Sequence, residues 1–369
     1  MEQIIKKVLK KIESNGYEAY IVGGYVRDLL LGKKTYDVDI CTNALPRDLN
    51  RIFPSCINNN YGGITFKIKK FNFDITTYRK EIKYEDRKPI EIEYINNLFE
   101  DIMRRDFKMN AICINSKGFI IDLIDGMSDV KNHVINAIGD NDKKFVEDPL
   151  RMLRAIRFMT VLDFELDSDT YESIKRNKKE ILTLSQYRVK DELDKILVNP
   201  NALKGLKVLK DLGILGLLEI EYTDIKYVSD PLGMWSQLKM NFNSAFTKEE
   251  KNTIINIRKI LETKKIDKLT LFEYGLYQCS VAGEILGINK VAINKIYKRL
   301  PIGNKKDLSV TPKEILEILN IEPSEVLSII INDITKEILN RKLKNNYQDI
   351  KRFLLSRKAT WIKWVWNHY

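Results

Sequence analysis

Two kinds of hydrophobic periodicity divide the chain. Up to about residue 138, segments in which apolar and polar positions alternate are interleaved with segments of helical spacing, whereas from about residue 170 onward the periodic segments are helical. Alternation predicts strands over residues 20–22, 65–69, 73–77, 90–95 and 118–123. Helical spacing predicts helices over residues 2–15, 26–31, 47–52, 99–114, 145–158 and 185–197. The pattern therefore predicts an α+β chain, with a small mixed α/β N-terminal domain followed by an all-helical remainder.

The most informative stretch is YIVGGYVRDLLLGKKTYDVDIC at residues 20–41, in which a second strand carries Asp37 and Asp39. Because strand residues alternate between faces, the two carboxylates point the same way while Val38 and Ile40 point into a core. Two adjacent carboxylates repel each other unless a cation lies between them. Mg²⁺ fits such a site, since it binds one or two carboxylates and completes its octahedron with water and substrate phosphates.

A glycine pair, Gly23-Gly24, separates the first strand from the helix that follows. Glycine lets the backbone approach a phosphate closely, and a helix N-terminus offers free N–H groups and a positive dipole end. Arg27 and Lys33 lie near enough in sequence to add positive charge. Alone, a glycine pair is typical of a turn and a D-x-D pair of a solvated strand end. Together, in this order, they predict a site for a nucleoside triphosphate and a metal.

Composition narrows the class of protein. A chain of 369 residues with 44% hydrophobic content predicts two or more folding units. The sequence contains no secretory leader pattern and no run of 18 apolar residues, and its four cysteines form no C-x-x-C pair, which favours the cytoplasm and excludes a typical structural zinc site. Only two histidines occur, which argues against histidine-based acid–base chemistry. The net charge of +11 favours a polyanionic partner.

The longer pattern GGYVRDLLLG…YDVDICTNALP resembles class II tRNA nucleotidyltransferases and bacterial poly(A) polymerases, within the superfamily that includes DNA polymerase beta. The resemblance covers almost the whole chain and is most specific from residue 17 to 160. It implies that Asp37 and Asp39 are the catalytic metal ligands and that Asp74 corresponds to a third acidic residue, although a solvated strand position explains Asp74 equally well. It also implies four parts: a nucleotidyltransferase head at 1–138, a helical neck at 139–200, a helical body at 201–300 and a basic tRNA-binding tail at 301–369.

The stretch RRDFKMNA resembles the family's motif B, which contacts the ribose through the equivalents of Arg105, Asp106 and Asn110. Asp106 and Asn110 are four residues apart and would share one face of the helix predicted over 99–114. A salt-bridged solvent face is the alternative interpretation.

Residues 79–90, RKEIKYEDRKPI, lack a clear period and are predicted to form a mobile loop. In the family, a flexible loop at this place carries an Asp-Arg pair, matched here by Asp86 and Arg87, and reshapes the nucleotide pocket between C and A addition. Further along, LIDGMSDVKNHVI resembles motif C, where Asp122, Asp125 and Gly126 form a hinge between head and neck.

The segment FVEDPLRMLRAIRF resembles motif D, which reads the incoming base. Glu147 and Asp148 precede a proline, as expected in the first turn of a helix, and Arg151 lies three and four residues further on, on the same face. Arg154 and Arg157 continue at helical spacing. The alternative interpretation is a helix cap with intrahelical ion pairs. The helix predicted over 185–197, SQYRVKDELDKIL, resembles motif E, which has a structural role in the family.

Asp148 and Arg151 suffice in principle to select C and A without a nucleic-acid template. Cytosine and adenine both present an amine donor beside a ring-nitrogen acceptor, whereas uracil and guanine invert this order. A carboxylate beside a guanidinium accepts from the amine and donates to the ring nitrogen. A buried mispaired polar group costs about 1–3 kcal/mol, which disfavours UTP and GTP.

These observations predict an enzyme that adds CCA to the tRNA 3′ end from CTP and ATP, with Mg²⁺ and with release of pyrophosphate. An A-adding enzyme or a poly(A) polymerase is the nearest alternative, and a catalytically inactive RNA-binding protein is a more distant one. The last 29 residues contain eight Lys or Arg and one Asp, which predicts phosphate contacts by the tail. The tryptophans at 361, 364 and 366 have spacings that suit packing as well as stacking on RNA. The sequence leaves the oligomeric state open.

Overall fold

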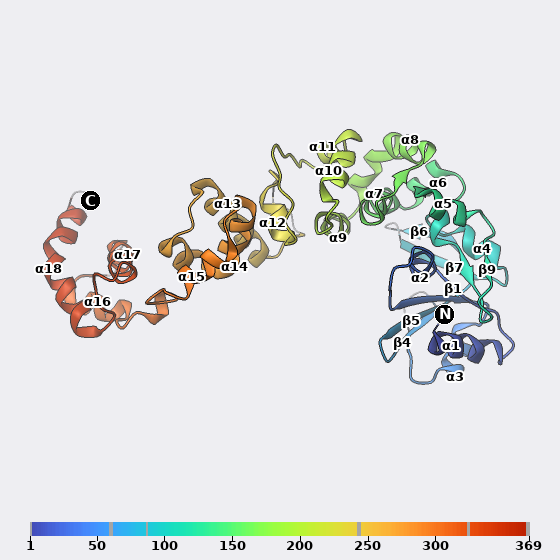
Figure 1. Ribbon diagram of the computed structural model, residues 1–369, viewed down its shortest axis with the longest axis horizontal. Coiled ribbons are helices and arrows are strands. Elements are labelled where there is room, and N and C mark those ends of the chain that lie inside the picture. Colours follow the sequence, from blue (N-terminus) through green and yellow to red (C-terminus); the bar gives the residue numbers. More distant parts are fainter. Residues whose placement is uncertain (1, 59–61, 86–87, 242–244, 323–324, 367–369) are drawn as a thin grey trace. The chain divides into compact units, whose positions relative to one another are not determined.

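The structure is a computed structural model that describes residues 2–58, 62–85, 88–241, 245–322 and 325–366 (Figure 1). The chain folds into two compact units, of which the first extends to Glu221 and the second begins at Tyr222. The first unit contains the residues assigned to the head and neck. Sheet structure is confined to it within the described residues, so the α+β fold predicted from the periodicity is confirmed.

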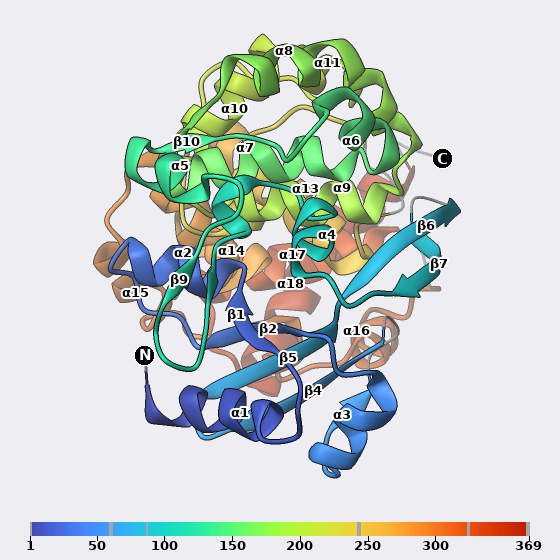
Figure 2. The ribbon, with the colours of Figure 1, turned by 90° about the vertical axis from the view of Figure 1, so that its right-hand side faces the viewer.

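A seven-stranded mixed sheet, in the order β3-β4-β5-β2-β1-β8-β9, forms the centre of the head (Figure 2). β2 and β5 are parallel, and the other neighbouring strands are antiparallel. The bounds are β1 Ala19–Val22, β2 Asp37–Thr42, β3 Ile57–Asn58, β4 Gly63–Ile68, β5 Phe71–Thr77, β8 Cys113–Ile114 and β9 Ile120–Ile121. The strand predicted over 118–123 is therefore only two residues long.

Five short helices accompany this sheet, with bounds α1 Gln3–Glu13, α2 Gly24–Leu30, α3 Pro46–Ile52, α4 Leu98–Met103 and α5 Gly126–Asn132. The apolar stripe of α1 is buried, as its spacing predicts. In Figure 2, α1 and α3 lie on the lower side of the sheet, away from the helices of residues 139–221. The opposite side of the sheet is therefore left to the strand ends and turns that form the site.

The segment predicted as a mobile loop belongs instead to a β-hairpin of β6 (Arg79–Glu85) and β7 (Lys88–Tyr94), and β7 corresponds to the strand predicted over 90–95. Its strands are antiparallel and their register shifts near Lys83. A two-stranded ribbon can remain charged on both faces, because its backbone groups bond to each other and neither face has to enter a core. The loop prediction was therefore wrong for the described residues. Asp86 and Arg87 lie outside them.

The helix predicted over 99–114 was also too long, because α4 ends at Met103 and is followed by a turn, the 3-10 helix η1 (Lys108–Asn110) and β8. Lys108 N donates to Asn136 O, and Ile138 N donates to Asp106 O, so this stretch is held in extended form by a distant segment. Phe107 is fully buried at the same place. Tertiary pairing here overrides the local helical spacing.

The remainder of the first unit is mostly helical. Its elements are β10 Val134–Ile135, α6 Asn141–Glu147, α7 Leu150–Leu162, β11 Glu165–Leu166, α8 Ser168–Asn177, η2 Lys178–Thr183, α9 Gln186–Leu197, α10 Ala202–Asp211 and α11 Ile214–Leu217. The helix predicted over 145–158 is broken at Asp148-Pro149, since proline lacks the N–H that would continue α6. Glu147 therefore ends α6 rather than opening the next helix, which corrects its predicted position.

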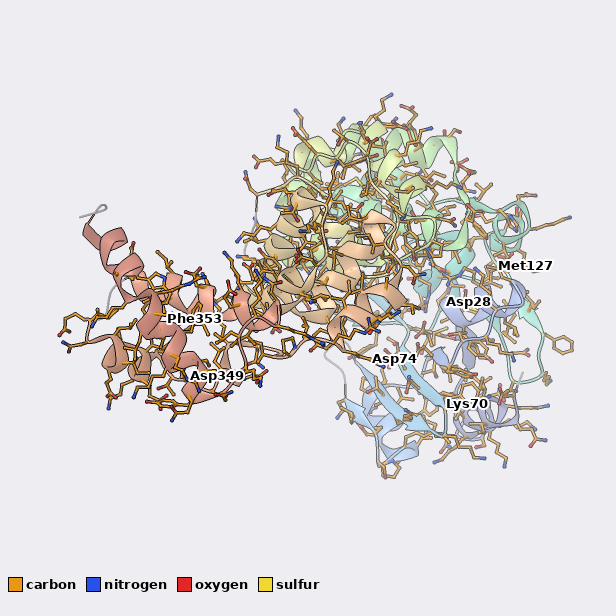
Figure 3. The ribbon with its side chains drawn as sticks, turned by 60° about the vertical axis from the view of Figure 1, so that its left-hand side comes forward. Asp28, Lys70, Asp74, Met127, Asp349 and Phe353 are labelled. Atoms are coloured by element: carbon orange, nitrogen blue, oxygen red, sulfur yellow. The ribbon has the colours of Figure 1, made fainter. Side chains whose placement is uncertain are left out.

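The second unit is helical, with bounds α12 Pro231–Ser236, α13 Lys248–Thr263, α14 Lys268–Leu286, α15 Lys290–Tyr297, η3 Lys305–Asp307, α16 Pro312–Leu319, α17 Val326–Leu339 and α18 Tyr347–Trp366. Figure 3 labels Asp349 and Phe353 on α18. This helix contributes Ile350, Leu354 and Trp361 to a buried cluster, and the Trp361 indole donates to Asp333 at 3.0 Å. Trp361 is therefore a packing residue. Across the described residues, no helix is long and apolar enough to cross a membrane.

Candidate active site

A cavity of about 700 Å³ in the first unit brings together most of the sequence-predicted site residues. It is formed by the β1–α2 turn, β2, the start of the hairpin, the turn after α4, and the helices α7 and α9. Its lining comprises Gly23, Gly24, Arg27, Asp39, Arg79, Glu81, Arg104, Arg105, Asp106, Asn110, Asp148, Leu150, Arg151, Arg154, Phe158 and Arg188. Seven arginines line this cavity, so it is suited to a polyanionic ligand.

The glycine turn is fitted closely to Asp39. Gly23 has a φ of 78°, and a Cβ placed there would lie 2.7 Å from Asp39 Oδ2. Both facts require glycine, the first because L side chains rarely adopt this backbone conformation and the second because of direct overlap. The motif GG therefore serves two purposes, since it turns the chain into α2 and leaves room for the carboxylate.

Three carboxylates occupy adjacent positions on β2 and β5. Asp37 and Asp39 are exposed between buried neighbours, as the alternation predicts, and Asp39 pairs in register with Asp74. Asn72 donates to Asp37 Oδ1 at 2.7 Å. Asp39 lines the cavity, whereas Asp37 and Asp74 do not.

The electrostatics of Asp39 identify a place for a cation. The pKa of Asp39 is raised to about 6, chiefly by desolvation and also by the negative charges of Asp74 and Asp37, while Arg105 and Arg27 oppose the rise. A bound cation would relieve this repulsion. Among the described residues no three acidic, histidine or cysteine side chains converge as a complete metal site. Two carboxylates nevertheless fit Mg²⁺, whose remaining ligands come from water and phosphate oxygens.

A partly buried hydrogen-bond chain joins Arg27 of α2 to residues of motifs B and D. Arg27 Nη1 donates to Asn110 Oδ1 at 2.7 Å, and Asn110 Nδ2 donates to Asp106 Oδ1 at 3.2 Å. Arg154 donates to Asp106 Oδ2 through Nη2 at 2.6 Å and through Nε at 2.9 Å. Burial opposes ionisation of Asp106, but Arg154 and the donors around it hold its pKa below its usual range. Asp106 and Asn110 thus remain neighbours, although they do not share a helix.

Arg105 donates a hydrogen bond to Asp101, a fully buried carboxylate that also accepts one from Arg104. Arg105 Nη2 lies 3.1 Å from Asp101 Oδ2 and Arg104 lies 2.8 Å from Oδ1. Burial would lower the pKa of Arg105, but Asp101 raises it above its ordinary value. The two guanidinium groups are therefore fixed as charges at the cavity wall.

Asp148 and Arg151 both line the cavity, but they are paired with other groups and not with each other. Arg188 Nη2 lies 3.3 Å from Asp148 Oδ1, which also accepts from Leu150 N. Arg151 donates to Glu147 Oε2 and to Lys144 O through Nη1, and to Arg104 O through Nη2. The bend at Asp148 removes the common helix face on which the sequence placed the three residues.

Arg157, which the sequence predicted as a site residue, does not line the cavity, whereas its neighbour Phe158 does. Arg157 Nε lies 2.7 Å from the buried carboxylate of Glu192. The guanidinium groups of Arg27, Arg154 and Arg157 lie 5.1, 5.5 and 4.2 Å from the ring centroid of Phe158. Such contacts attract cations to an aromatic face. The ring of Phe158 therefore packs against all three guanidinium groups.

Sequence reasoning omitted six cavity residues: Arg79, Glu81, Arg104, Leu150, Phe158 and Arg188. Arg104 lies next to the predicted motif B residues, and Leu150 and Phe158 lie inside motif D, so proximity in sequence was an available signal. Arg188 belongs to the helix that was given a structural role. Arg79 and Glu81 belong to the segment expected to be a loop, and only the hairpin brings them to the cavity.

The motif C residues hold the start of α5. Asp122 accepts from Gly126 N at 2.9 Å through Oδ1 and from Met127 N at 2.7 Å through Oδ2. Asp125 has a φ of 61°, and a Cβ at Gly126 would lie 2.2 Å from Lys108 O. Gly126 therefore allows α5 to pack directly on the backbone of η1, which carries Asn110.

The mixed sheet, its paired strand carboxylates and the glycine turn define the nucleotidyltransferase class of protein. Residues 19–136 match the family model for the poly A polymerase head domain, residues 163–221 the model for the RNA and SrmB binding site of polymerase A, and residues 237–354 a model for tRNA nucleotidyltransferase domain 2. The CCA-adding enzyme of Ligilactobacillus salivarius is 31% identical over 92% of both chains, and that of Lactobacillus gasseri is 33% identical over 94% of this chain and 95% of the relative. The chain therefore belongs to the CCA-adding enzymes, a family of class II tRNA nucleotidyltransferases.

Solved structures agree with this assignment. The crystal structure of the Bacillus stearothermophilus CCA-adding enzyme in complex with CTP matches with a TM-score of 0.85 at 26% identity, covering 98% of this chain and all of that one. The Thermotoga maritima CCA-adding enzyme complexed with tRNA shares the fold, with a TM-score of 0.66 at 21% identity over 96% of both chains. The match extends over both compact units, so the resemblance is not limited to the head.

Proposed function

We propose that this protein adds CCA to the 3′ end of tRNA, using CTP, ATP and Mg²⁺. The observation that carries the proposal is a single cavity lined by a predicted metal ligand, Asp39, and by the two predicted base readers, Asp148 and Arg151. The names of the relatives and of the solved structures support the same activity. The cytoplasmic location predicted from the sequence stays a prediction.

The reaction forms one bond and breaks another at the α-phosphorus of the nucleotide. The 3′-hydroxyl oxygen of the RNA bonds to the α-phosphorus in line, the α–β phosphoanhydride bond breaks, and the hydroxyl proton and pyrophosphate leave. Asp37 and Asp39 would hold Mg²⁺, with Asp74 beside them. When bound, Mg²⁺ lowers the pKa of the attacking hydroxyl and neutralises charge on the leaving pyrophosphate. Asp39 must be ionised for this role, which the cation itself favours.

The cavity arginines have a separate task, namely to hold the triphosphate and ribose. Arg27 and Arg154 are fixed through Asn110 and Asp106, and Phe158 supports both from below. Fixed donors lose little conformational freedom when a ligand binds, so more of the interaction energy contributes to positioning. We assign Asp106 and Asn110 to the ribose, as the resemblance implies, because both line the cavity.

Base selection falls to Asp148 and Arg151. Asp148 has one carboxylate oxygen engaged by Arg188 and Leu150 N, which leaves acceptor capacity for an exocyclic amine. Arg151 uses two of its nitrogens within the protein and has five N–H donors in all. Both residues are anchored by neighbouring protein groups, and this anchoring supports their assignment as a rigid template for C and A.

The experiment that tests the function uses tRNA transcripts that end before CCA, before CA or before A. Each transcript is incubated with one labelled nucleotide and Mg²⁺, and the products are separated on a sequencing gel. We expect CMP on the first two transcripts, AMP on the third, and neither UMP nor GMP on any. AMP alone on the last transcript would assign A-only addition, and a long adenylate ladder would assign a poly(A) polymerase.

Two controls complete this test. Chelation of Mg²⁺ with EDTA should stop incorporation, since Asp37 and Asp39 then hold no cation. The Asp37→Ala variant, purified in the same way, should be inactive and so exclude a contaminating enzyme. Tight tRNA binding without any incorporation by the wild type would instead support the inactive RNA-binding protein.

A further inference from the structure

A second hollow, of about 430 Å³, lies in the head apart from the candidate active site. It is formed by the chain ahead of α1, by α2, by the segment between α2 and β2, and by the turn between β4 and β5. Its lining comprises Glu2, Tyr25, Leu29, Lys33, Lys34, Thr35, Tyr36 and Lys70, none of which lines the larger cavity. Lys33, which the sequence placed near the nucleotide, belongs to this hollow.

Positive charge dominates the hollow. Three lysines, Lys33, Lys34 and Lys70, face a single carboxylate, that of Glu2. Lys70 Nζ lies 2.9 Å from Glu2 Oε1, and both side chains are about half exposed. An exposed ion pair of this kind contributes little stability, so an incoming anion can replace the carboxylate. Figure 3 labels Lys70 at the β4–β5 turn.

The hollow also has an apolar rim suited to a nucleoside. Tyr36 is 43% exposed and Leu29 is 42% exposed. The edge of the Tyr36 ring is set against Phe71, with ring centroids 5.7 Å apart, and Lys70 Nζ lies 5.0 Å from the Tyr36 centroid. An exposed ring held in place beside cationic side chains is the arrangement on which single-stranded nucleic acids stack.

The hollow lies next in sequence to the carboxylates proposed to hold the metal. Tyr36 directly precedes Asp37, and Asn72 joins the two, since its N donates to Tyr36 O and its Nδ2 to Asp37 Oδ1. Lys34 lies three residues before Asp37, a separation of at most about 11 Å along the chain. A strand whose 3′ end reaches the carboxylates can therefore have a preceding phosphate at the lysines.

We propose that this hollow binds a phosphate-bearing nucleotide of the RNA strand whose 3′-hydroxyl is extended. Lys33, Lys34 and Lys70 contact the phosphate, and the sugar or base rests on Tyr36. The assignment of this RNA as tRNA rests on the proposed function. Free pyrophosphate or nucleotide carries the same phosphate chemistry, and the experiment separates these sources.

The test compares the Lys33→Ala/Lys34→Ala double variant with a matched control, Lys117→Ala/Lys131→Ala. The control removes two exposed lysines of the same head that line neither cavity. Binding of a tRNA transcript lacking CCA is measured by fluorescence anisotropy between 50 and 200 mM KCl. Loss of two phosphate contacts lowers the log–log salt slope by about 1.4 to 1.8, so the wild type should lose roughly sevenfold to twelvefold more affinity than the double variant over this range. The control should keep the slope of the wild type.

A second variant, Tyr36→Leu, retains bulk at the rim and removes the aromatic face. It should raise KM for tRNA while leaving KM for CTP and the salt slope unchanged, because stacking carries no charge. Melting temperatures of all variants verify folding. Equal slopes in the two lysine variants would overturn the hollow as a site.

A third arm measures inhibition by pyrophosphate. Weaker inhibition of the Lys33→Ala/Lys34→Ala variant with unchanged tRNA affinity would overturn the RNA assignment and assign the hollow to free phosphate. The binding assay needs no catalysis. A wild type that binds tRNA with the steep slope but fails to incorporate CMP therefore refutes the proposed function and leaves the hollow supported.

Discussion

Replacement of Asp148 by alanine gives the sharpest test of base selection. The carboxylate is only partly occupied in the structure, by Arg188 at 3.3 Å and by Leu150 N at 3.2 Å, so its loss removes the proposed acceptor for the amine of C or A. A hydrogen bond to a charged group contributes about 1.5–3 kcal/mol. We therefore expect kcat/KM for CTP and ATP to fall roughly tenfold to a hundredfold, with relaxed rejection of UTP and GTP.

The competing explanation is that Asp148 only stabilises the bend between α6 and α7. On that view Asp148→Ala lowers the melting temperature and leaves nucleotide selection intact. A matched control is Glu147→Gln, which removes the adjacent carboxylate and its ion pair with Arg151 outside the cavity. Because Arg151 keeps its bonds to Lys144 O and Arg104 O without this ion pair, the variant should still reject UTP.

The assay measures single-turnover incorporation of each nucleotide on a tRNA ending before CCA, together with melting temperature. Base reading predicts misincorporated UMP for Asp148→Ala and none for Glu147→Gln. A destabilised Asp148→Ala variant that still refuses UTP would show that this carboxylate supports the bend and reads nothing.

The other predictions concern the proposed metal ligands, the pH dependence of stability, the hairpin and the tail. Asp37→Ala and Asp39→Ala should abolish CMP transfer while tRNA binding and melting temperature are retained; near-normal transfer by either would refute the metal assignment. The pKa of Asp39 in the folded protein is raised to about 6, so the protonated carboxyl contributes to stability below its ordinary pKa, and this contribution is lost as pH rises through 6. Asp39→Asn should therefore raise the melting temperature of the metal-free protein at pH 7 but not at pH 4. Asp86→Ala/Arg87→Ala should spare both C additions and impair the final A, as read on a sequencing gel; equal loss at all three steps would leave only a general positioning role. Replacement of the exposed tail residues Lys351 and Arg352 by alanine should lower the salt slope of tRNA binding by up to about 1.8. An unchanged slope would place the RNA surface elsewhere.

The tail prediction needs substitutions, because truncation would not be a clean test. Removal of the chain after Asn340 would take away α18 and with it Ile350, Leu354 and Trp361, which belong to the buried cluster of the tail. Loss of such core residues costs several kcal/mol, typically 2–5 for each large side chain. Weaker tRNA binding after truncation would then reflect unfolding. The sequence could not separate these cases, since tryptophan spacing fits both packing and stacking.

Local periodicity predicted the elements whose side chains face a core. The strand with Asp37 and Asp39 and the stripe of α1 are as expected, because burial of alternate or every third and fourth residue is recorded directly in the pattern. The strand predicted over 90–95 corresponds to β7, whereas its partner β6 was missed for the opposite reason. β6 is held by backbone pairing with β7, and its charged sequence leaves no hydrophobic pattern to recognise.

Side-chain partners were harder to predict than positions. Asp148 and Arg151 reach the same cavity, as the motif implied, and Arg151 pairs with Glu147 at the spacing of four residues that the sequence shows, but Asp148 pairs with Arg188, on a helix some 40 residues away in sequence. Proximity in three dimensions also recruits Glu81 to the cavity. No spacing rule along the chain contains this information, because it depends on tertiary packing.

The contacts of Asp148 and Arg151, the proposed base readers, bear on how C and A are distinguished in turn. Asp106, Asn110 and Arg154 form a buried chain that should be the same for both nucleotides, so the change between them has to come through a less rigid element. Glu81, at the start of the hairpin, lies 3.7 Å from Arg104 Nη1, and the Arg104 carbonyl accepts from Arg151 Nη2 at 3.3 Å. A shift at the base of the hairpin therefore alters the support of Arg151 through two direct contacts. This connection gives the predicted effect of the hairpin on the final A addition a physical route.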